Sequence, residues 1–71
     1  MTNLPEAIAA KIREMNEQII PEYVAIIPIA PMTALTVAVM RHELNEAVEA
    51  LASGDVLRMI RSYDAIKDYA V

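Results

Sequence analysis

His42 is the single histidine of this chain, and it lies four residues before Glu46 in the run His-Glu-Leu-Asn-Glu. Residues four apart share one face of a helix, so this pair has half of the geometry of a zinc site. The zinc-protease motif needs a second histidine where Glu46 stands and a third ligand elsewhere. Neither is present in the sequence, and we interpret His42 as a solvated side chain on the outer face of a helix.

Carboxylates recur every three residues at Glu43, Glu46 and Glu49, and Asp64 and Asp68 follow in the next segment. Acidic groups on facing helices can hold Mg²⁺, which in turn can hold a nucleotide phosphate. Over residues 43–68 the layout resembles in part the all-helical nucleotide pyrophosphohydrolases of the MazG type. Those enzymes carry a paired Glu-Glu and a second Glu-x-x-Asp set that this chain lacks, so the family is not assigned. Nucleotide or Mg²⁺ binding is an alternative to our preferred interpretation, an acidic solvent-exposed face paired with arginines.

Other catalytic chemistry finds little support in the sequence. A nucleophilic Ser, Thr or Cys needs an oriented base beside it, and Ser53 and Ser62 are better explained as turn and surface residues. The chain has no cysteine and one glycine, which excludes a thiolate site and a glycine-rich phosphate loop. We therefore expect no catalytic residue, no metal site and no cofactor.

The net charge is −4, and the six basic residues form no run. Nucleic-acid binding relies on clustered Lys and Arg, so we expect no nucleic-acid partner. The N-terminus has no basic segment of the kind that begins a secretory signal, which favours a cytoplasmic location.

The pattern of apolar residues predicts an all-α fold with helices over about 4–20, 32–53 and 55–70, in one domain of 71 residues. Asn3 is a suitable N-cap, and Pro21 is expected to end the first helix. Gly54 and Asp55 predict a tight turn between the last two helices, which form an antiparallel hairpin. Folding at Gly54 places opposite charges side by side, in the pairs Arg58–Glu49, Arg61–Glu46 and Arg41–Asp68.

Residues 21–31 are predicted to be an extended connector, because prolines interrupt them and β-branched residues dominate the rest. From Tyr23 to Met40 the chain has no charged residue. Apolar residues make up 56% of the whole chain. A chain this short cannot bury so many apolar side chains alone, which favours a homo-oligomer, most simply a dimer. A single membrane span over residues 23–40 is the alternative, and the prolines argue against it.

Binding of another protein, rather than catalysis, is the function that the sequence favours. We expect a small accessory protein of the kind that a phage or mobile element encodes. It would inhibit or adapt a host protein by stoichiometric contact. The partner-binding residues are predicted to be Tyr23, Ile26, Ile27, Ile29, Arg41, His42, Arg58 and Arg61. The oligomer interface is predicted to contain Ile8, Ile12, Met32, Leu35, Val37, Val39 and Met40.

Overall fold

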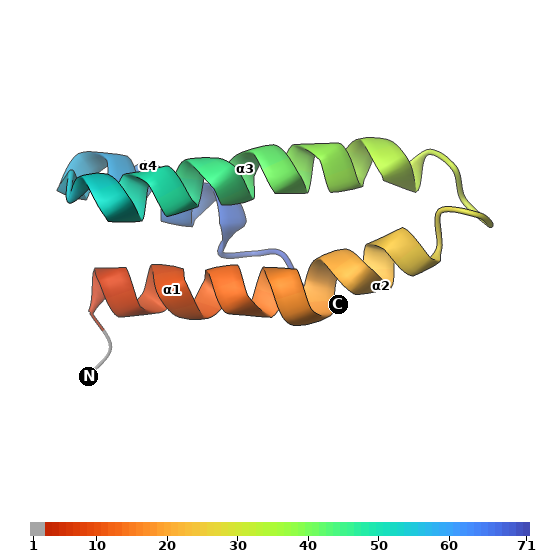
Figure 1. The fold of residues 1–71 in the computed structure, drawn as a ribbon, viewed down its shortest axis with the longest axis horizontal. Helices are drawn as coiled ribbons and strands as arrows, with labels where there is room; N and C mark the ends of the chain where they lie inside the picture. The colour runs from red at the N-terminus through yellow and green to blue at the C-terminus, as the bar shows by residue number, and fades with distance from the viewer. Residues whose placement is uncertain (1–2) are drawn as a thin grey trace.

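The computed structural model describes residues 3–71 and shows three helical rods with no strand among those residues, which confirms the all-α prediction (Figure 1). The first rod is continuous and comprises α1 (Leu4–Glu14), the π-helical segment η1 (Met15–Ile19) and α2 (Ile20–Ala25). The second rod is α3 (Thr33–Ser53), and the third is α4 (Val56–Ile66).

The helix ends follow local chemistry. The Asn3 side chain accepts a 2.9 Å hydrogen bond from the Glu6 amide, so the predicted N-cap of α1 is confirmed. Gly54 adopts the left-handed conformation (φ 73°) at the end of α3, where a residue with a Cβ would be strained. Asp55 then caps α4 by accepting a 3.2 Å hydrogen bond from the Arg58 amide.

The first rod extends past Pro21, where the sequence led us to expect its end. Pro21 has no N–H to donate to the preceding turn, and its ring would clash with the carbonyl there. The chain avoids this conflict by widening the turn before it: the Ile20 amide donates to the Met15 carbonyl, five residues back. Residues 21–25 are therefore helical, and the prediction of an extended connector over residues 21–31 is not what the structure shows.

Turns, rather than extended chain, join α2 to α3. Backbone hydrogen bonds run from the Ile29 and Ala30 amides to the Ile26 carbonyl, at 3.0 and 2.8 Å. The Thr33 amide then donates to the Ala30 carbonyl at 2.9 Å as α3 begins. The β-branched residues of this segment thus adopt compact turns, because the prolines at 28 and 31 fit turn positions as well as extended ones.

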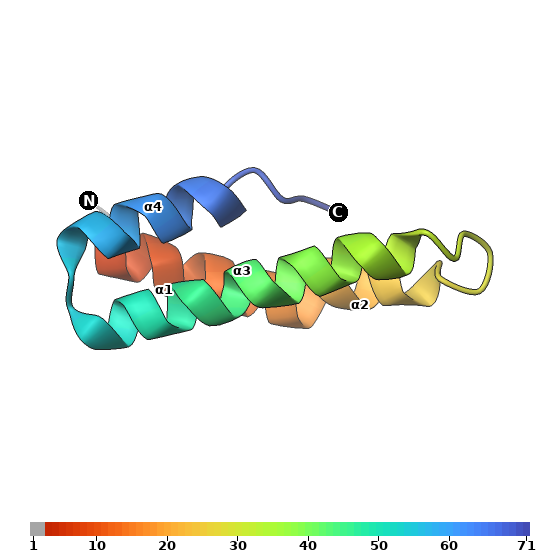
Figure 2. The same ribbon diagram turned by 90° about the horizontal axis from the view of Figure 1, so that it is seen from above.

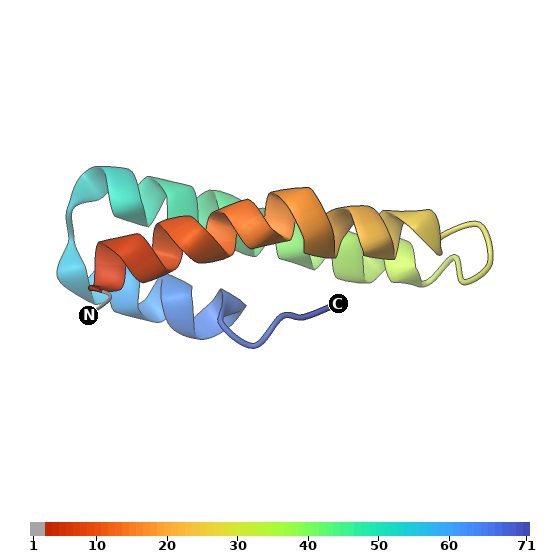
Figure 3. The ribbon, with the colours of Figure 1, turned by 90° about the horizontal axis from the view of Figure 1, so that it is seen from below.

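The rods differ in length, so the two ends of the molecule differ in construction. Helix α3 has 21 residues and α4 has 11, which correspond to lengths of about 31 Å and 16 Å. At the Gly54 end, α1, α3 and α4 lie side by side, whereas beyond the end of α4 only α2 and the first half of α3 remain (Figures 2 and 3). The C-terminal residues pass from α4 towards α2 on the same side of the molecule. The last helix ends at Ile66, four residues short of the predicted end.

A single core lies between the rods and is made of aliphatic side chains. Its fully buried members include Met15 and Ile19 from η1 and Ile66 from α4. Ile8, Val37 and Met40 also belong to this core, with exposed fractions of 0%, 6% and 0%, and Ile12 packs against it. These four were predicted to form an oligomer interface. In the structure they instead hold the chain's own helices together, because each points towards the opposing rod.

Candidate interaction surface

The end of the molecule that lacks a third helix exposes large apolar side chains. We call residues 20–40 the apolar arm; it comprises α2, the following turns and the first part of α3. Its exposed members, with exposed fractions in parentheses, are Val24 (39%), Ile26 (45%), Ile29 (86%), Met32 (73%), Leu35 (62%) and Val39 (50%). Tyr23 and Ile27 are half-buried and pack on the core. The arm's only charged side chain is Glu22, so this surface carries no charge from Tyr23 to Met40.

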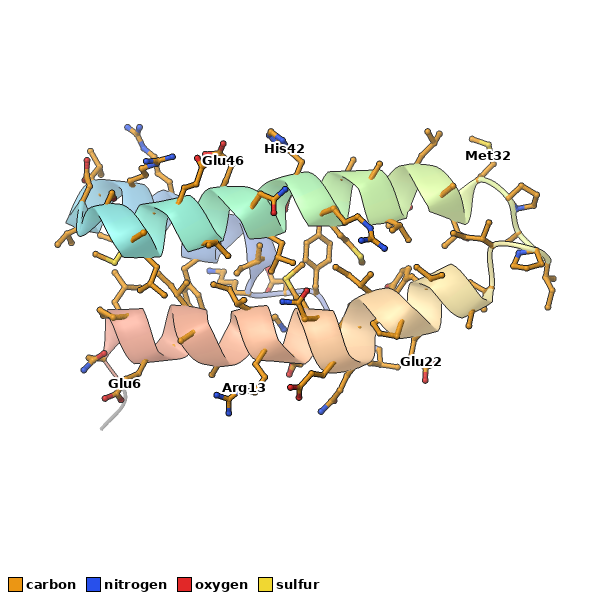
Figure 4. All side chains as sticks on the ribbon, viewed as in Figure 1. Glu6, Arg13, Glu22, Met32, His42 and Glu46 are labelled. Atoms are coloured by element: carbon orange, nitrogen blue, oxygen red, sulfur yellow. The ribbon has the colours of Figure 1, made fainter. Side chains whose placement is uncertain are left out.

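Three of these residues form a line along α3. Met32, Leu35 and Val39 follow one another at spacings of three and four, which places them on one face of the helix. The same spacing continues to His42 and Glu46. Figure 4 shows Met32, His42 and Glu46 pointing away from the first rod, whereas Glu6, Arg13 and Glu22 point away from α3 on the opposite side. We call Met32, Leu35 and Val39 the α3 outer stripe.

A shallow groove between α3 and α4 brings together three of the predicted partner-binding residues. His42, Arg58 and Arg61 line it, together with Glu46. Arg58 Nη2 lies 3.0 Å from Glu49 Oε2 and 3.6 Å from Glu46 Oε2, so the predicted Arg58–Glu49 pair is present. Within residues 3–71 Glu46 pairs with Arg58 rather than with Arg61, and no ion pair joins Arg41 to Asp68. Arg58 lies about one helical turn closer than Arg61 to Gly54, where the chain passes from α3 to α4.

The structure separates the remaining predicted contacts. Arg41 is exposed but does not line the groove that contains His42, because adjacent residues on a helix point about 100° apart. Ile29 lies at the tip of the apolar arm, 13 residues before His42 along the chain. The predicted partner-binding set therefore divides into an apolar part on the arm and a charged part between α3 and α4, and Arg41 belongs to neither.

The carboxylates of α3 and α4 find partners within the chain. Glu43 Oε2 accepts a 3.1 Å hydrogen bond from the Tyr69 hydroxyl, and Glu46 and Glu49 face Arg58 as described. Asp64 Oδ1 lies 2.9 Å from Lys67 Nζ. No group of three or more potential metal ligands occurs in the part of the chain that the structure describes. The geometry that a Mg²⁺–nucleotide site requires, several carboxylates converging on one point, is not formed by these side chains.

The C-terminal tail, residues 67–71, ties α4 back to the first rod and to α3. Lys11 Nζ donates to the Tyr69 carbonyl and also lies 2.7 Å from Glu14 Oε1. The Tyr23 hydroxyl donates a longer bond of 3.4 Å to the Ala70 carbonyl. Val71 then lies beside Tyr23 and Ile26, in a small apolar hollow that Glu22 borders. No local pattern in the sequence indicates these contacts, because Lys11 and Tyr69 are 58 residues apart.

Two side chains of this C-terminal region have shifted ionisation. Partial burial, together with the hydrogen bond to Glu43, raises the pKa of the Tyr69 hydroxyl above its ordinary value, because both disfavour the phenolate. The hydrogen bond to Asp64 raises the pKa of the exposed Lys67 amine, because the carboxylate favours the charged form.

A second group of exposed apolar residues, which the sequence analysis missed, lies near the Gly54 turn. Its members are Val48 (47%), Val56 (59%), Leu57 (58%) and Ile60 (51%). Glu49, Asp55 and Arg58 interrupt this group along the chain. The apolar arm has no such interruption over 18 residues, which makes it the better candidate for a protein contact.

None of the helices in residues 3–71 has both the length and the apolar character that a membrane span needs. Comparisons of this chain with protein-family models, with curated proteins and with solved structures find no match.

Proposed function

We propose that this chain is a non-enzymatic interaction module that binds a protein stoichiometrically through its apolar arm. The observation that carries the proposal is the exposure of Ile29, Met32 and Leu35, at 86%, 73% and 62%, on an uncharged surface. Contiguous apolar surface of this kind marks contact sites in small water-soluble proteins. The arm supplies the apolar centre of the contact, and His42 and Arg41 lie at its charged border.

The total exposed area supports the same interpretation. The chain exposes 4772 Å², whereas a compact monomer of its 7.9 kDa mass would expose about 4,400 Å². The excess reflects the elongated shape, with extents of 39 × 21 × 16 Å, and the two-helix construction of the arm. A partner on the arm would supply the third layer of helix that α4 supplies at the other end. Assembly into a helical bundle is therefore the form of binding that we favour.

A stoichiometric inhibitor or adaptor is the functional class that fits such a module. Because the outer face of the first rod carries Glu6, Arg13 and Glu22, we propose that it stays in solvent while the arm is bound (Figure 4). The carboxylates of α3 act in this scheme as partners for Arg58 and Tyr69, and not as ligands of a nucleotide-bound metal.

A photo-crosslinking amino acid at position 29 tests the proposal, with the same amino acid at Leu57 as the matched control. Both positions are exposed and apolar, at 86% and 58%, but only Ile29 lies on the arm. We expect a covalent protein adduct of one defined mass from position 29 in cells, and none from position 57. Adducts from both positions alike, or none from position 29, would overturn the proposal. A melting shift with Mg²⁺-ATP that Glu46→Gln abolishes would favour the nucleotide-binding alternative.

A further inference from the structure

We infer that the occupant of the apolar arm is a second copy of this chain, packed antiparallel along the α3 outer stripe with Leu35 at the two-fold axis. This inference rests on the proposed function and names the partner. It keeps Met32, Leu35 and Val39 of the interface that the sequence predicted. It leaves out Ile8, Ile12, Val37 and Met40, which are already used in the chain's own core.

One side of the arm is more open than the other. On the α2 side, the end of the C-terminal tail already lies in the apolar hollow, with Val71 beside Tyr23 and Ile26. On the α3 side, Met32, Leu35 and Val39 are 73%, 62% and 50% exposed, and α4 ends before it reaches them (Figure 2). An incoming helix therefore finds its largest uncovered apolar surface along α3.

The charge of the chain also favours a second copy as the occupant of the arm. The chain carries a net charge of −4, so two copies repel each other over most of their surfaces. The 18 residues from Tyr23 to Met40 contain no charged side chain, so this is where two copies can meet without like charges opposing each other. A strongly charged partner, acidic or basic, would gain nothing from the same surface.

The register that an antiparallel pair can adopt also fits the α3 outer stripe. With Leu35 on the two-fold axis, Val39 of one copy lies about 6 Å from the axis and Met32 of the other lies about 4.5 Å from it on the same side. His42 lies about 10 Å from the axis, near the tip of the other copy's arm. Glu46 lies about 16 Å from the axis, beyond that tip. This register places apolar residues against apolar residues and leaves Glu46 in solvent.

Registers shifted towards the charged part of α3 are worse because they bring charges into the contact. An axis at His42 would set Val39 of one copy against Glu46 of the other, since these two lie at similar distances on either side of His42. An axis at Glu46 would oppose two carboxylates directly. The isologous geometry of a two-fold pair therefore selects the centre of the α3 outer stripe.

The area that such an interface needs is a small share of the exposed surface. A stable interface buries about 800 Å² on each partner, which is roughly a sixth of the 4772 Å² that this chain exposes. The arm includes the first eight of the 21 residues of α3, and two such arms would form a four-helix layer made of two α2–α3 pairs.

Single cysteines test this register, because the chain has none of its own. A residue on a two-fold axis faces its own copy, so Leu35→Cys should form a disulfide-linked dimer in most of the chains under mild oxidation. Leu57→Cys is the matched control, a leucine of similar exposure (58%) on α4, and should remain largely unlinked. Equal linking of both variants, or linking of Leu57→Cys alone, would overturn the inference.

Charged variants provide a second test that does not depend on disulfide chemistry. Leu35→Glu and Leu35→Lys should each be monomeric, because like charges would meet at the axis, while an equimolar mixture should recover dimers. Circular dichroism checks that both variants keep the helix content of the parent chain. A mixture that stays monomeric would overturn the register. If the parent chain is monomeric at about 100 µM while position 29 crosslinks to a different protein, self-association fails and the proposed function stands.

Discussion

The Tyr69 hydroxyl donates a 3.1 Å hydrogen bond to Glu43 Oε2, which joins the C-terminal tail to the middle of α3. Lys11 donates to the backbone carbonyl of the same tyrosine from α1, so Tyr69 contacts two rods at once. The tail thereby closes the junction at which the three-helix end of the molecule becomes the two-helix arm.

Tyr69 makes the stability of the fold sensitive to alkaline pH. Its pKa is raised in the folded chain, so above about pH 10 the unfolded chain loses this proton first. The folded chain then binds more protons than the unfolded chain, and the free energy of unfolding falls as the pH rises through that range. In urea titrations from pH 8 to pH 11, Tyr69→Phe should lose stability less steeply than the parent chain. Lys67, whose pKa is also raised, contributes equally in both proteins and cancels in the difference. Parallel curves would contradict the prediction.

Lys11 should contribute more to stability than its charge alone would suggest. Its side chain is 14% exposed, lies 2.7 Å from Glu14 and donates to the Tyr69 carbonyl. Lys11→Ala should lower the free energy of unfolding by about 1–2 kcal/mol, because the tail carbonyl loses a charged donor. Arg13→Ala is the control: Arg13 is exposed, and its loss should change stability by less than about 0.5 kcal/mol. Equal effects in chemical denaturation would show that the tail contact contributes nothing.

Two methionines of α3 should respond differently to truncation. Met40 is fully buried, and Met40→Ala should lower the free energy of unfolding by about 2–5 kcal/mol at every protein concentration. Met32 is 73% exposed in the monomer and belongs to the α3 outer stripe. Met32→Ala should mainly raise the dissociation constant of the dimer, leaving the stability of the dilute chain nearly unchanged. Denaturation measured at two concentrations separates these effects, and a concentration-independent loss in Met32→Ala would argue against its place in the interface.

Gly54 should be replaceable only at a conformational cost. Its φ of 73° is in the left-handed region, and a Cβ at this position would meet no atom within 4 Å. The penalty for Gly54→Ala therefore comes from the backbone alone, about 1 kcal/mol in the free energy of unfolding. Gly54→Asn should cost less, because asparagine tolerates this conformation better. Thermal melts of the two variants make the comparison, and an alanine variant as stable as the parent would contradict it.

Local signals in the sequence predicted the features that depend on neighbouring residues. Asn3 caps α1, Gly54 ends α3 and Asp55 caps α4, each through contacts within a few residues. Pro21 was misread, because the usual rule for proline assumes a regular α-helix and the widened turn of η1 relieves the conflict. Packing of Ile19 and Ile20 into the core favours continuing the rod.

The candidate site was only partly predictable for a similar reason. The lack of charge from Tyr23 to Met40 pointed to the arm, and Ile29, Met32, Leu35 and Val39 are indeed exposed there. The sequence could not show which apolar residues face inwards, because an all-round apolar segment has no amphipathic face to read. The contacts of the tail join residues that lie far apart in the chain, and no local pattern marks them.

The mass of the unmodified chain in plain buffer shows whether the apolar arm pairs two copies. Light scattering at about 100 µM should give twice the 7.9 kDa of one chain, falling towards a single chain on dilution. The same measurement on Leu35→Glu should give one chain at both concentrations. A parent chain that remains a folded 7.9 kDa monomer at about 100 µM would contradict the account, because its apolar arm would then be stable in water without a second copy.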